Sequence, residues 1–191
     1  MFHLVSGLID SVFKESKRNF LLLGIDSSGK TTLLEKIKNI YKGSPNKKLN
    51  PIYPTIGLNI ERFQVKEKHI VMRDLGGEQS LREIWANYYK GTEGIIYVFD
   101  ASDLNQQRIE ESRQTFEQLV EDEELQDVPI LIFANKQDKE QKLSKKDVEN
   151  IFCDSIPMGG VFAVVECSVH NVEALTKGIE WIVSKIPQEK K

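Results

Sequence analysis

Hydrophobic positions along this chain alternate between two patterns. Short continuous apolar runs, such as 20–23 and 94–100, are typical of strands that are buried on both faces of a sheet. Other stretches, such as 106–119 and 172–186, carry apolar residues at every third or fourth position, which predicts amphipathic helices. Strands that alternate with helices predict an α/β fold, in which a mostly parallel six-stranded sheet has helices on both faces.

The remaining elements continue this alternation. Two strands joined by a polar turn are expected at 56–65 and 69–73, and further elements are expected at 129–134 (strand), 145–152 (helix) and 161–165 (strand). In a doubly wound sheet, a ligand binds beyond the carboxyl ends of the parallel strands. We therefore expect the functional residues to lie at these strand ends.

Residues 1–17 are predicted to be a separate unit, ahead of a globular domain that spans residues 18–191. Met1–Phe13 carries one apolar stripe at helical spacing, and Lys14, Lys17 and Arg18 follow it. Two interpretations of this amphipathic helix remain open. It either stays docked on the surface of the domain or attaches reversibly to a membrane interface.

Composition narrows the class of protein. The 26 basic and 29 acidic side chains give a net charge of −3. Because the chain has no excess of basic residues, we do not expect a nucleic acid as its partner. Two cysteines do not make a disulfide framework and fit a reducing compartment. No apolar run is long enough to span a membrane, and no secretory signal is recognised. We expect a protein of the cytoplasm, or one attached to a membrane from that side.

The segment Gly24–Thr32 fits the phosphate-binding pattern G-x-x-x-x-G-K-[ST] between a predicted strand and a predicted helix. Its backbone N–H groups would converge on an anion at the helix N-terminus, where the helix dipole also favours negative charge. Lys30 would reach the β- and γ-phosphates, and the Thr31 hydroxyl would bind Mg²⁺. The expected nucleotide-binding residues of this loop are Gly24, Asp26, Ser27, Ser28, Gly29, Lys30, Thr31 and Thr32.

A second part of the site is predicted where the 69–73 strand ends. There, Asp74 begins the sequence Asp74-Leu75-Gly76-Gly77. A carboxylate that ends a strand beside a phosphate loop can hold Mg²⁺ through a water molecule. By itself this sequence would indicate only a turn, so the assignment depends on the phosphate loop.

The segment Asn135–Asp138 predicts which base is bound. The Asp138 carboxylate can accept two hydrogen bonds from the N1–H and the exocyclic amine of guanine, whereas adenine has only an acceptor at its ring N1. Lys136 can pack along the base plane, and Asn135 can tie this loop to the phosphate loop. The backbone of Ser168 and Val169 can donate to guanine O6. The sequence therefore predicts GTP and GDP, together with Mg²⁺, as cofactors.

With these motifs in place, the chain resembles the small GTPases of the ADP-ribosylation factor (Arf) and Arf-like family over nearly its whole length. The resemblance is carried by 24–32, 54–59, 74–77 and 135–138, and it implies the small G-protein form of the P-loop NTPase fold, with 18–191 as the GTP-binding domain. Within the family, the Arf-related subgroup is the most similar. This similarity rests on the opening residues of the chain, on Tyr88-Tyr89 and on 178–181. This subgroup implies peripheral attachment to Golgi membranes.

The resemblance also implies roles that the residues alone do not. Thr55 would bind Mg²⁺ from the first switch segment, and Gly77 would donate its N–H to the γ-phosphate from the second. An exchange factor, an activating protein and effectors would bind through these segments. The strand pair between them would shift on GTP binding and release the N-terminal helix, which favours its membrane interpretation.

The chain departs from the family at three positions. Phe2 replaces the glycine that most members myristoylate, so membrane attachment would depend on the helix and, by analogy with the subgroup, on acetylation of Met1.

Glu78 replaces the glutamine that orients the attacking water. A carboxylate there repels the γ-phosphate and cannot donate a hydrogen bond unless it is protonated, so slow hydrolysis is expected. Arg73 replaces a surface tryptophan, so a changed set of effectors is expected unless the arginine is simply solvated.

The sequence thus predicts a GTP/GDP switch of Golgi-related membrane traffic that hydrolyses GTP slowly. Lys30, Thr55, Gly77 and Glu78 are the expected catalytic residues. Two other functions remain open: a nucleotide-loaded scaffold that barely hydrolyses GTP, and a P-loop kinase for a small substrate. Turnover measurements distinguish the first alternative, and competition between GTP and ATP distinguishes the second.

Overall fold

A computed structural model of the chain describes residues 17–49 and 51–186. The N-terminal helix predicted for 1–17 lies outside these residues, except that Lys17 already belongs to the first strand. The strands are β1 (Lys17–Leu23), β2 (Leu58–Val65), β3 (Lys68–Leu75), β4 (Gly94–Asp100), β5 (Ile130–Asn135) and β6 (Phe162–Glu166). The helices are α2 (Lys30–Tyr41), α3 (Gln106–Val120), α4 (Lys145–Phe152) and α5 (Val172–Lys185). Short 3-10 helices are η1 (Gln79–Tyr88), η2 (Glu123–Leu125) and η3 (Cys153–Ser155).

The six strands form one sheet in the order β2-β3-β1-β4-β5-β6. The strands pair in parallel except for β2 and β3, which form an antiparallel hairpin. The parallel register places Leu22 beside Asp74 and Asp100 beside Asn135. The carboxyl ends of β1, β3, β4 and β5 therefore meet at one edge of the sheet, as the sequence predicts.

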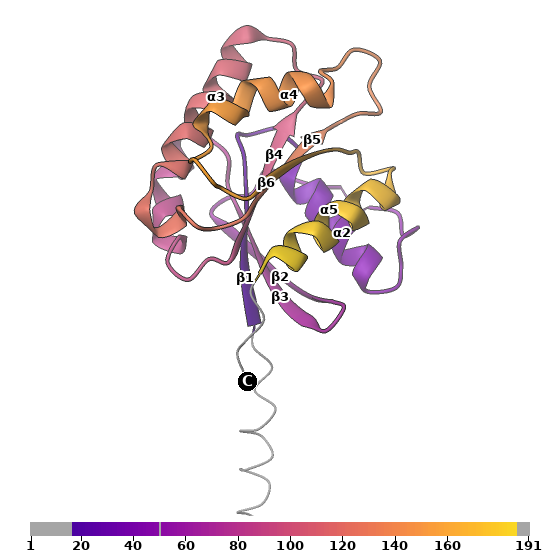
Figure 1. Cartoon of the computed structure of the whole chain (residues 1–191). Helices are drawn as coiled ribbons and strands as arrows, with labels where there is room; N and C mark the ends of the chain where they lie inside the picture. Colours follow the sequence, from indigo (N-terminus) through magenta and orange to yellow (C-terminus); the bar gives the residue numbers. More distant parts are fainter. Residues whose placement is uncertain (1–16, 50, 187–191) are drawn as a thin grey trace, which may run out of the picture.

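Helices cover both faces of the sheet (Figure 1). On one face, α2 and α5 pack over a core that includes Phe20, Leu22 and Ile179. On the other face, α3, α4 and η1 enclose a second core, in which the buried Tyr97 ring makes edge-to-face contacts with Phe116 and Phe152. The three-layer α/β prediction is confirmed.

The bounds predicted for 94–100 and 145–152 are those observed, and the other element boundaries differ from the predictions by up to three residues. The predicted strand at 56–65 starts only at Leu58, because Ile56 lies outside the sheet and is 90% exposed. The predicted strand at 69–73 extends to Lys68–Leu75, so Asp74 is part of β3 and does not merely follow it. The 3-10 helix η1 was not predicted, and its segment was left without an assigned element.

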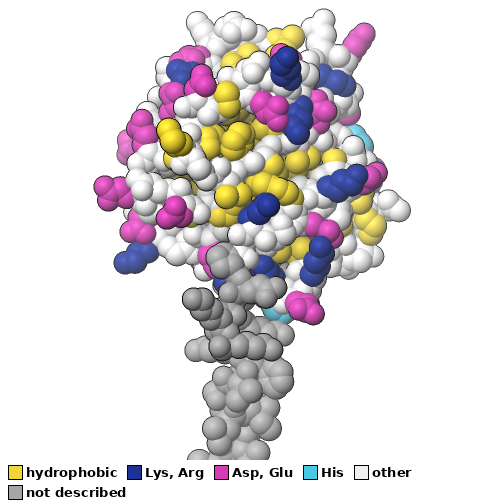
Figure 2. All heavy atoms as spheres, viewed as in Figure 1, with side chains coloured by type: hydrophobic (Ala, Val, Ile, Leu, Met, Phe, Trp, Pro, Cys, Tyr) yellow, Lys and Arg dark blue, Asp and Glu magenta, His cyan; other side chains and the backbone are white. Residues whose placement is uncertain are grey.

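The surface agrees with the balanced composition. Figure 2 shows hydrophobic side chains gathered in the middle of one face, with charged side chains of both signs around them. Within the part of the chain that the structure describes, no helix is long and apolar enough to cross a membrane.

Candidate nucleotide-binding site

The phosphate loop joins β1 to α2, and its backbone leaves no room for larger residues at the first glycine. Gly24 has a φ of +140°, and a Cβ at this position would lie 2.3 Å from the carbonyl oxygen of Val98. Gly29 is the N-cap of α2, and its carbonyl accepts from the Leu33 N–H at 3.0 Å. The loop therefore ends at a helix N-terminus, which is the geometry that binds anions.

Lys30 is held in place by a backbone carbonyl of the phosphate loop. Its side chain is 6% exposed, and its ammonium donates to the Ile25 carbonyl at 2.8 Å. Burial lowers the pKa of Lys30 to about 8, while the carboxylates of Asp74 and Asp26 act in the opposite direction. A bound phosphate would supply the negative charge that a buried ammonium favours.

Three oxygen-bearing side chains from separate parts of the chain meet beside Lys30. The Thr31 hydroxyl lies 2.7 Å from the Thr55 hydroxyl and donates to the Asp74 carboxylate at 2.7 Å. Thr55 also donates to this carboxylate, at 3.4 Å. Asp74 is fully buried, and burial raises its pKa, whereas the Thr31 hydrogen bond and Lys30 act to lower it.

This cluster fits a magnesium ion. Mg²⁺ prefers oxygen ligands at about 2.0–2.1 Å and octahedral angles, so two adjacent ligands lie about 2.9 Å apart, close to the separation of the two threonine hydroxyls. The other Asp74 oxygen, Oδ1, is buried and has no hydrogen-bond partner among the described residues. A water molecule of a hydrated ion would satisfy it.

The segment around Gly77 is packed directly against the phosphate loop. The Gly77 carbonyl accepts from the Asp26 N–H at 3.0 Å, and a Cβ on Gly77 would lie 2.5 Å from the Gly24 carbonyl oxygen. One residue earlier, the Gly76 N–H donates to the Gly57 carbonyl at 2.9 Å. The two segments that carry Thr55 and Gly77 are therefore joined to each other and to the loop.

The segment after β5 is tied to the same loop. The Asn135 amide, which is buried, donates to the Ser28 carbonyl at 2.8 Å, and the Lys136 ammonium donates to the Ser27 carbonyl at 2.9 Å. Lys136 also pairs with Asp100 at the end of β4, with 2.5 Å between the charged atoms. The link predicted between Asn135 and the phosphate loop is present.

Asp138, Ser168 and Val169 follow β5 and β6 at the same edge of the sheet, but they do not line the cavity described below. Asp138 is exposed, and no described residue pairs with its carboxylate. The Gln137 N–H donates to the Cys167 carbonyl at 3.0 Å, which places the predicted base-binding loop beside the start of 167–169. This hydrogen bond joins the two segments, and the Asp138 side chain is open to solvent.

A cavity of about 380 Å³ lies over these elements. Its lining includes most of the phosphate loop together with Thr55, Gly77, Glu78 and Lys136, as the sequence predicts. Glu78 is exposed in extended backbone immediately before η1. Ile52, Tyr53 and Pro54 also line the cavity and were not predicted. They directly precede Thr55 in the sequence, and this position could have indicated that they lie at the site.

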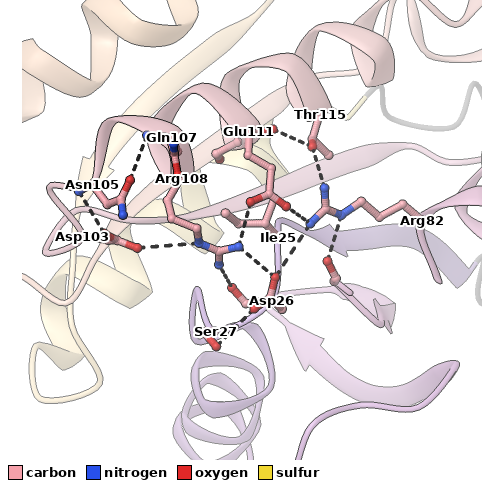
Figure 3. A network of polar contacts seen from close by, with 12 residues as sticks. Ile25, Asp26, Ser27, Arg82, Asp103, Asn105, Gln107, Arg108, Glu111 and Thr115 are labelled. Atoms are coloured by element: carbon pink, nitrogen blue, oxygen red, sulfur yellow. Dashed lines mark hydrogen bonds and ion pairs between the residues drawn. The ribbon is translucent and has the colours of Figure 1, made fainter. Parts of the chain in front are cut away.

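A network of charged side chains braces the phosphate loop from outside the cavity (Figure 3). The Arg108 guanidinium on α3 donates to the Asp26 carboxylate at 3.1 Å and to its carbonyl at 2.8 Å. Burial alone would raise the pKa of Asp26, but the hydrogen bond from Arg108 holds it below its usual value. Arg82 on η1 donates to the Gly77 carbonyl at 2.9 Å and to Glu111 at 2.5 Å. No sequence motif predicts these hydrogen bonds and ion pairs, because the residues that form them are distant along the chain.

Comparisons with known proteins agree with this geometry. The sequence model of the ADP-ribosylation factor family matches residues 5–186. ADP-ribosylation factor-like protein 3 of Saccharomyces cerevisiae is 37% identical over 195 residues, which cover 100% of this chain and 96% of the relative. Human ADP-ribosylation factor-related protein 1 is 38% identical over 186 residues, which cover 96% of this chain and 92% of the relative. The Arl6 BBS3 small GTPase of Trypanosoma brucei, solved with the nucleotide analogue GppNp, shares the fold with a TM-score of 0.75 and 23% identity, over 88% of this chain and 96% of that one.

Proposed function

Because the chain belongs to the ADP-ribosylation factor family of small GTPases, we propose that it is a GTP/GDP switch in Golgi-related membrane traffic that hydrolyses GTP slowly. One observation supports the switch function. The side chains of Thr31, Thr55 and Asp74 are hydrogen-bonded to one another, and the segment at Gly77 contacts the phosphate loop beside them. The Golgi assignment is carried over from the resemblance to the Arf-related subgroup.

Each part of the site has a proposed role. Lys30 neutralises the β- and γ-phosphates, the hydroxyls of Thr31 and Thr55 hold Mg²⁺, and Asp74 holds it through water. The ion, when bound, neutralises charge that develops on the phosphates. The Gly77 N–H binds the γ-phosphate, so GTP favours the joined arrangement of the two segments and GDP does not. The other proposed nucleotide contacts are those predicted from the sequence, in which the Asp138 carboxylate accepts hydrogen bonds from guanine.

Slow hydrolysis is proposed from Glu78. Glu78 lines the cavity directly after Gly77, so we place its carboxylate near the proposed position of the γ-phosphate. Like charges repel, and an ionised carboxylate cannot donate a hydrogen bond to the phosphate or position water by donation. The scaffold alternative differs only in that turnover is negligible even with an activating protein.

Glu78→Gln is expected to raise the single-turnover rate of GTP hydrolysis by about tenfold or more, because an amide removes the repulsion and restores a hydrogen-bond donor. Rapid quench of the GTP-loaded protein measures this rate. Gln79→Ala, one residue further along, is the matched control and should leave the rate unchanged. An unchanged rate in Glu78→Gln would show that Glu78 is not what slows hydrolysis.

Reversible membrane attachment is proposed for the helix predicted at 1–17. We expect Leu4→Asp combined with Leu8→Asp to weaken binding to phospholipid vesicles by about tenfold or more in the GTP-loaded protein, because burial of each leucine contributes about 1.5–3 kcal/mol. Co-sedimentation with vesicles measures this. Ser6→Asp is the control, since it adds charge at a position outside the apolar stripe. Equal binding by all variants would contradict the membrane role.

A further inference from the structure

Both backbone groups of Gly76, in the segment between β3 and η1, are held by hydrogen bonds. The Gly76 N–H donates to the Gly57 carbonyl at 2.9 Å, and the Gly76 carbonyl accepts from the indole Nε1–H of Trp85 at 2.9 Å. Trp85 belongs to η1, and its side chain is only 2% exposed. In a buried hydrogen bond neither group can turn to water instead. The Trp85 indole therefore fixes the direction of the Gly76 carbonyl.

The direction of this carbonyl decides where the next backbone N–H points. The peptide bond between Gly76 and Gly77 is trans, so the Gly77 N–H points away from Trp85. Gly77 is buried and lines the nucleotide cavity, yet no acceptor among the described residues pairs with its N–H. Buried backbone donors are almost always paired in folded proteins. A phosphate oxygen in the cavity would supply the acceptor that this donor lacks.

The following peptide group is held from the same helix. The Gly77 carbonyl accepts from the Arg82 Nε–H at 2.9 Å and from the Asp26 N–H at 3.0 Å. Arg82 lies three residues before Trp85 in η1, and side chains at this spacing lie one above the other on a 3-10 helix. The helix therefore presents two donors side by side, one to each of two consecutive carbonyls.

Helix η1 is in turn joined to α3. The Arg82 guanidinium donates to the Thr115 hydroxyl at 3.1 Å and to the Glu111 carboxylate at 2.5 Å (Figure 3). The Thr115 hydroxyl donates to the Glu111 carbonyl at 2.7 Å, and the neighbouring Phe116 is fully buried in the core. The donors of η1 are thus placed by the body of the domain and not by the segment that they hold.

We propose that Trp85 is a positioning residue for nucleotide discrimination. Its indole N–H holds the peptide between Gly76 and Gly77 in the orientation in which the Gly77 N–H donates to the γ-phosphate. Arg82 supports this orientation by holding the next carbonyl. GDP has no γ-phosphate, so the orientation contributes to the binding of GTP and not to that of GDP. The proposal rests on the proposed switch function, and it adds the side chain that sets the strength of the γ-phosphate contact.

Trp85→Phe removes the indole N–H and keeps an aromatic ring in the core. We expect the affinity for a non-hydrolysable GTP analogue to fall by about tenfold and the affinity for GDP to change by less than about threefold, because a hydrogen bond to a charged group corresponds to about tenfold or more in affinity. Isothermal titration with both nucleotides measures the two affinities. Trp181→Phe on α5, the same substitution at the other tryptophan of the chain, is the control and should change neither. Equal weakening of both nucleotides by Trp85→Phe, or no weakening, would overturn the proposal.

A closer isostere removes the donor and keeps the shape of the ring. In the Trp181→Phe chain Trp85 is the only tryptophan, so growth on benzothienylalanine replaces the indole N–H of this residue alone with a sulfur atom. Phosphorus NMR of the bound GTP analogue should then show a shifted γ-phosphate resonance, while the α-phosphate resonance stays in place. A loss of packing alone would not move the γ-phosphate resonance selectively. An unchanged γ-phosphate resonance would contradict the positioning role.

Gly77→Ala separates the proposal from the proposed function. If Gly77→Ala and Trp85→Phe both lower the preference for the analogue over GDP, the proposal is supported. If Gly77→Ala lowers it and Trp85→Phe does not, the switch stands and the positioning role of Trp85 is wrong. If neither variant lowers it, the switch itself is contradicted and the proposal falls with it. If only Trp85→Phe lowers it, Trp85 does not act through Gly77, and the proposal is wrong.

Discussion

Asp138→Asn is expected to lower the affinity for GTP by about 100-fold or more and to create affinity for xanthosine triphosphate. The carboxylate is exposed and has no partner among the described residues, so both of its oxygens are free to accept from guanine. Hydrogen bonds to a charged group contribute about 1.5–3 kcal/mol each, and 1.4 kcal/mol corresponds to a factor of ten. An amide has one acceptor and one donor, so the donor faces the guanine amine unfavourably and suits the xanthine carbonyl.

Titration of the variant with fluorescent GTP and xanthosine triphosphate measures this exchange. Because Asp138 is exposed, its replacement should change the free energy of unfolding by no more than about 0.5 kcal/mol, so a loss of GTP binding will not reflect unfolding. Lys139→Gln, at the next exposed residue, is the control and should bind GTP like the parent. If Asp138→Asn keeps its preference for GTP, Asp138 does not read the base.

Gly77→Ala is expected to weaken binding of a GTP analogue by about tenfold or more while changing GDP affinity by less than about threefold. The added Cβ would lie 2.5 Å from the Gly24 oxygen and 2.6 Å from the Asp26 nitrogen, both backbone atoms of the phosphate loop. Backbone atoms cannot rotate away, so the segment at Gly77 must leave the loop. Its proposed N–H bond to the γ-phosphate is then lost, and this bond exists only with GTP.

The matched control is Gly43→Ala. Gly43 has a φ of +75°, so alanine is strained there, but its Cβ would meet nothing within 4 Å. We expect a cost of about 1 kcal/mol in the free energy of unfolding, with the GTP-to-GDP preference unchanged. Isothermal titration with both nucleotides compares the variants. Equal weakening of GTP and GDP in Gly77→Ala would indicate general damage to the loop and would contradict the switch role of Gly77.

Local patterns in the sequence carried much of the fold. The apolar runs at 20–23 and 94–100 are buried central strands, and the helical periods at 106–119 and 172–186 are α3 and α5. These predictions succeeded because side chains buried on both faces of a sheet, or along one helix stripe, impose a period that is visible within a single element. The predicted start of β2 was wrong, since pairing with β3 and not local preference decides where β2 begins.

The sequence by itself also determined the phosphate loop, because Gly24–Thr32 is continuous and its spacing reflects the backbone shape that encloses a phosphate. Only the tertiary structure decided how distant groups meet. It brings the Thr31 and Thr55 hydroxyls within 2.7 Å of each other and joins Arg108 to Asp26 across 82 positions. Such contacts follow from the order and register of the strands and from helix packing, which no short stretch of sequence records.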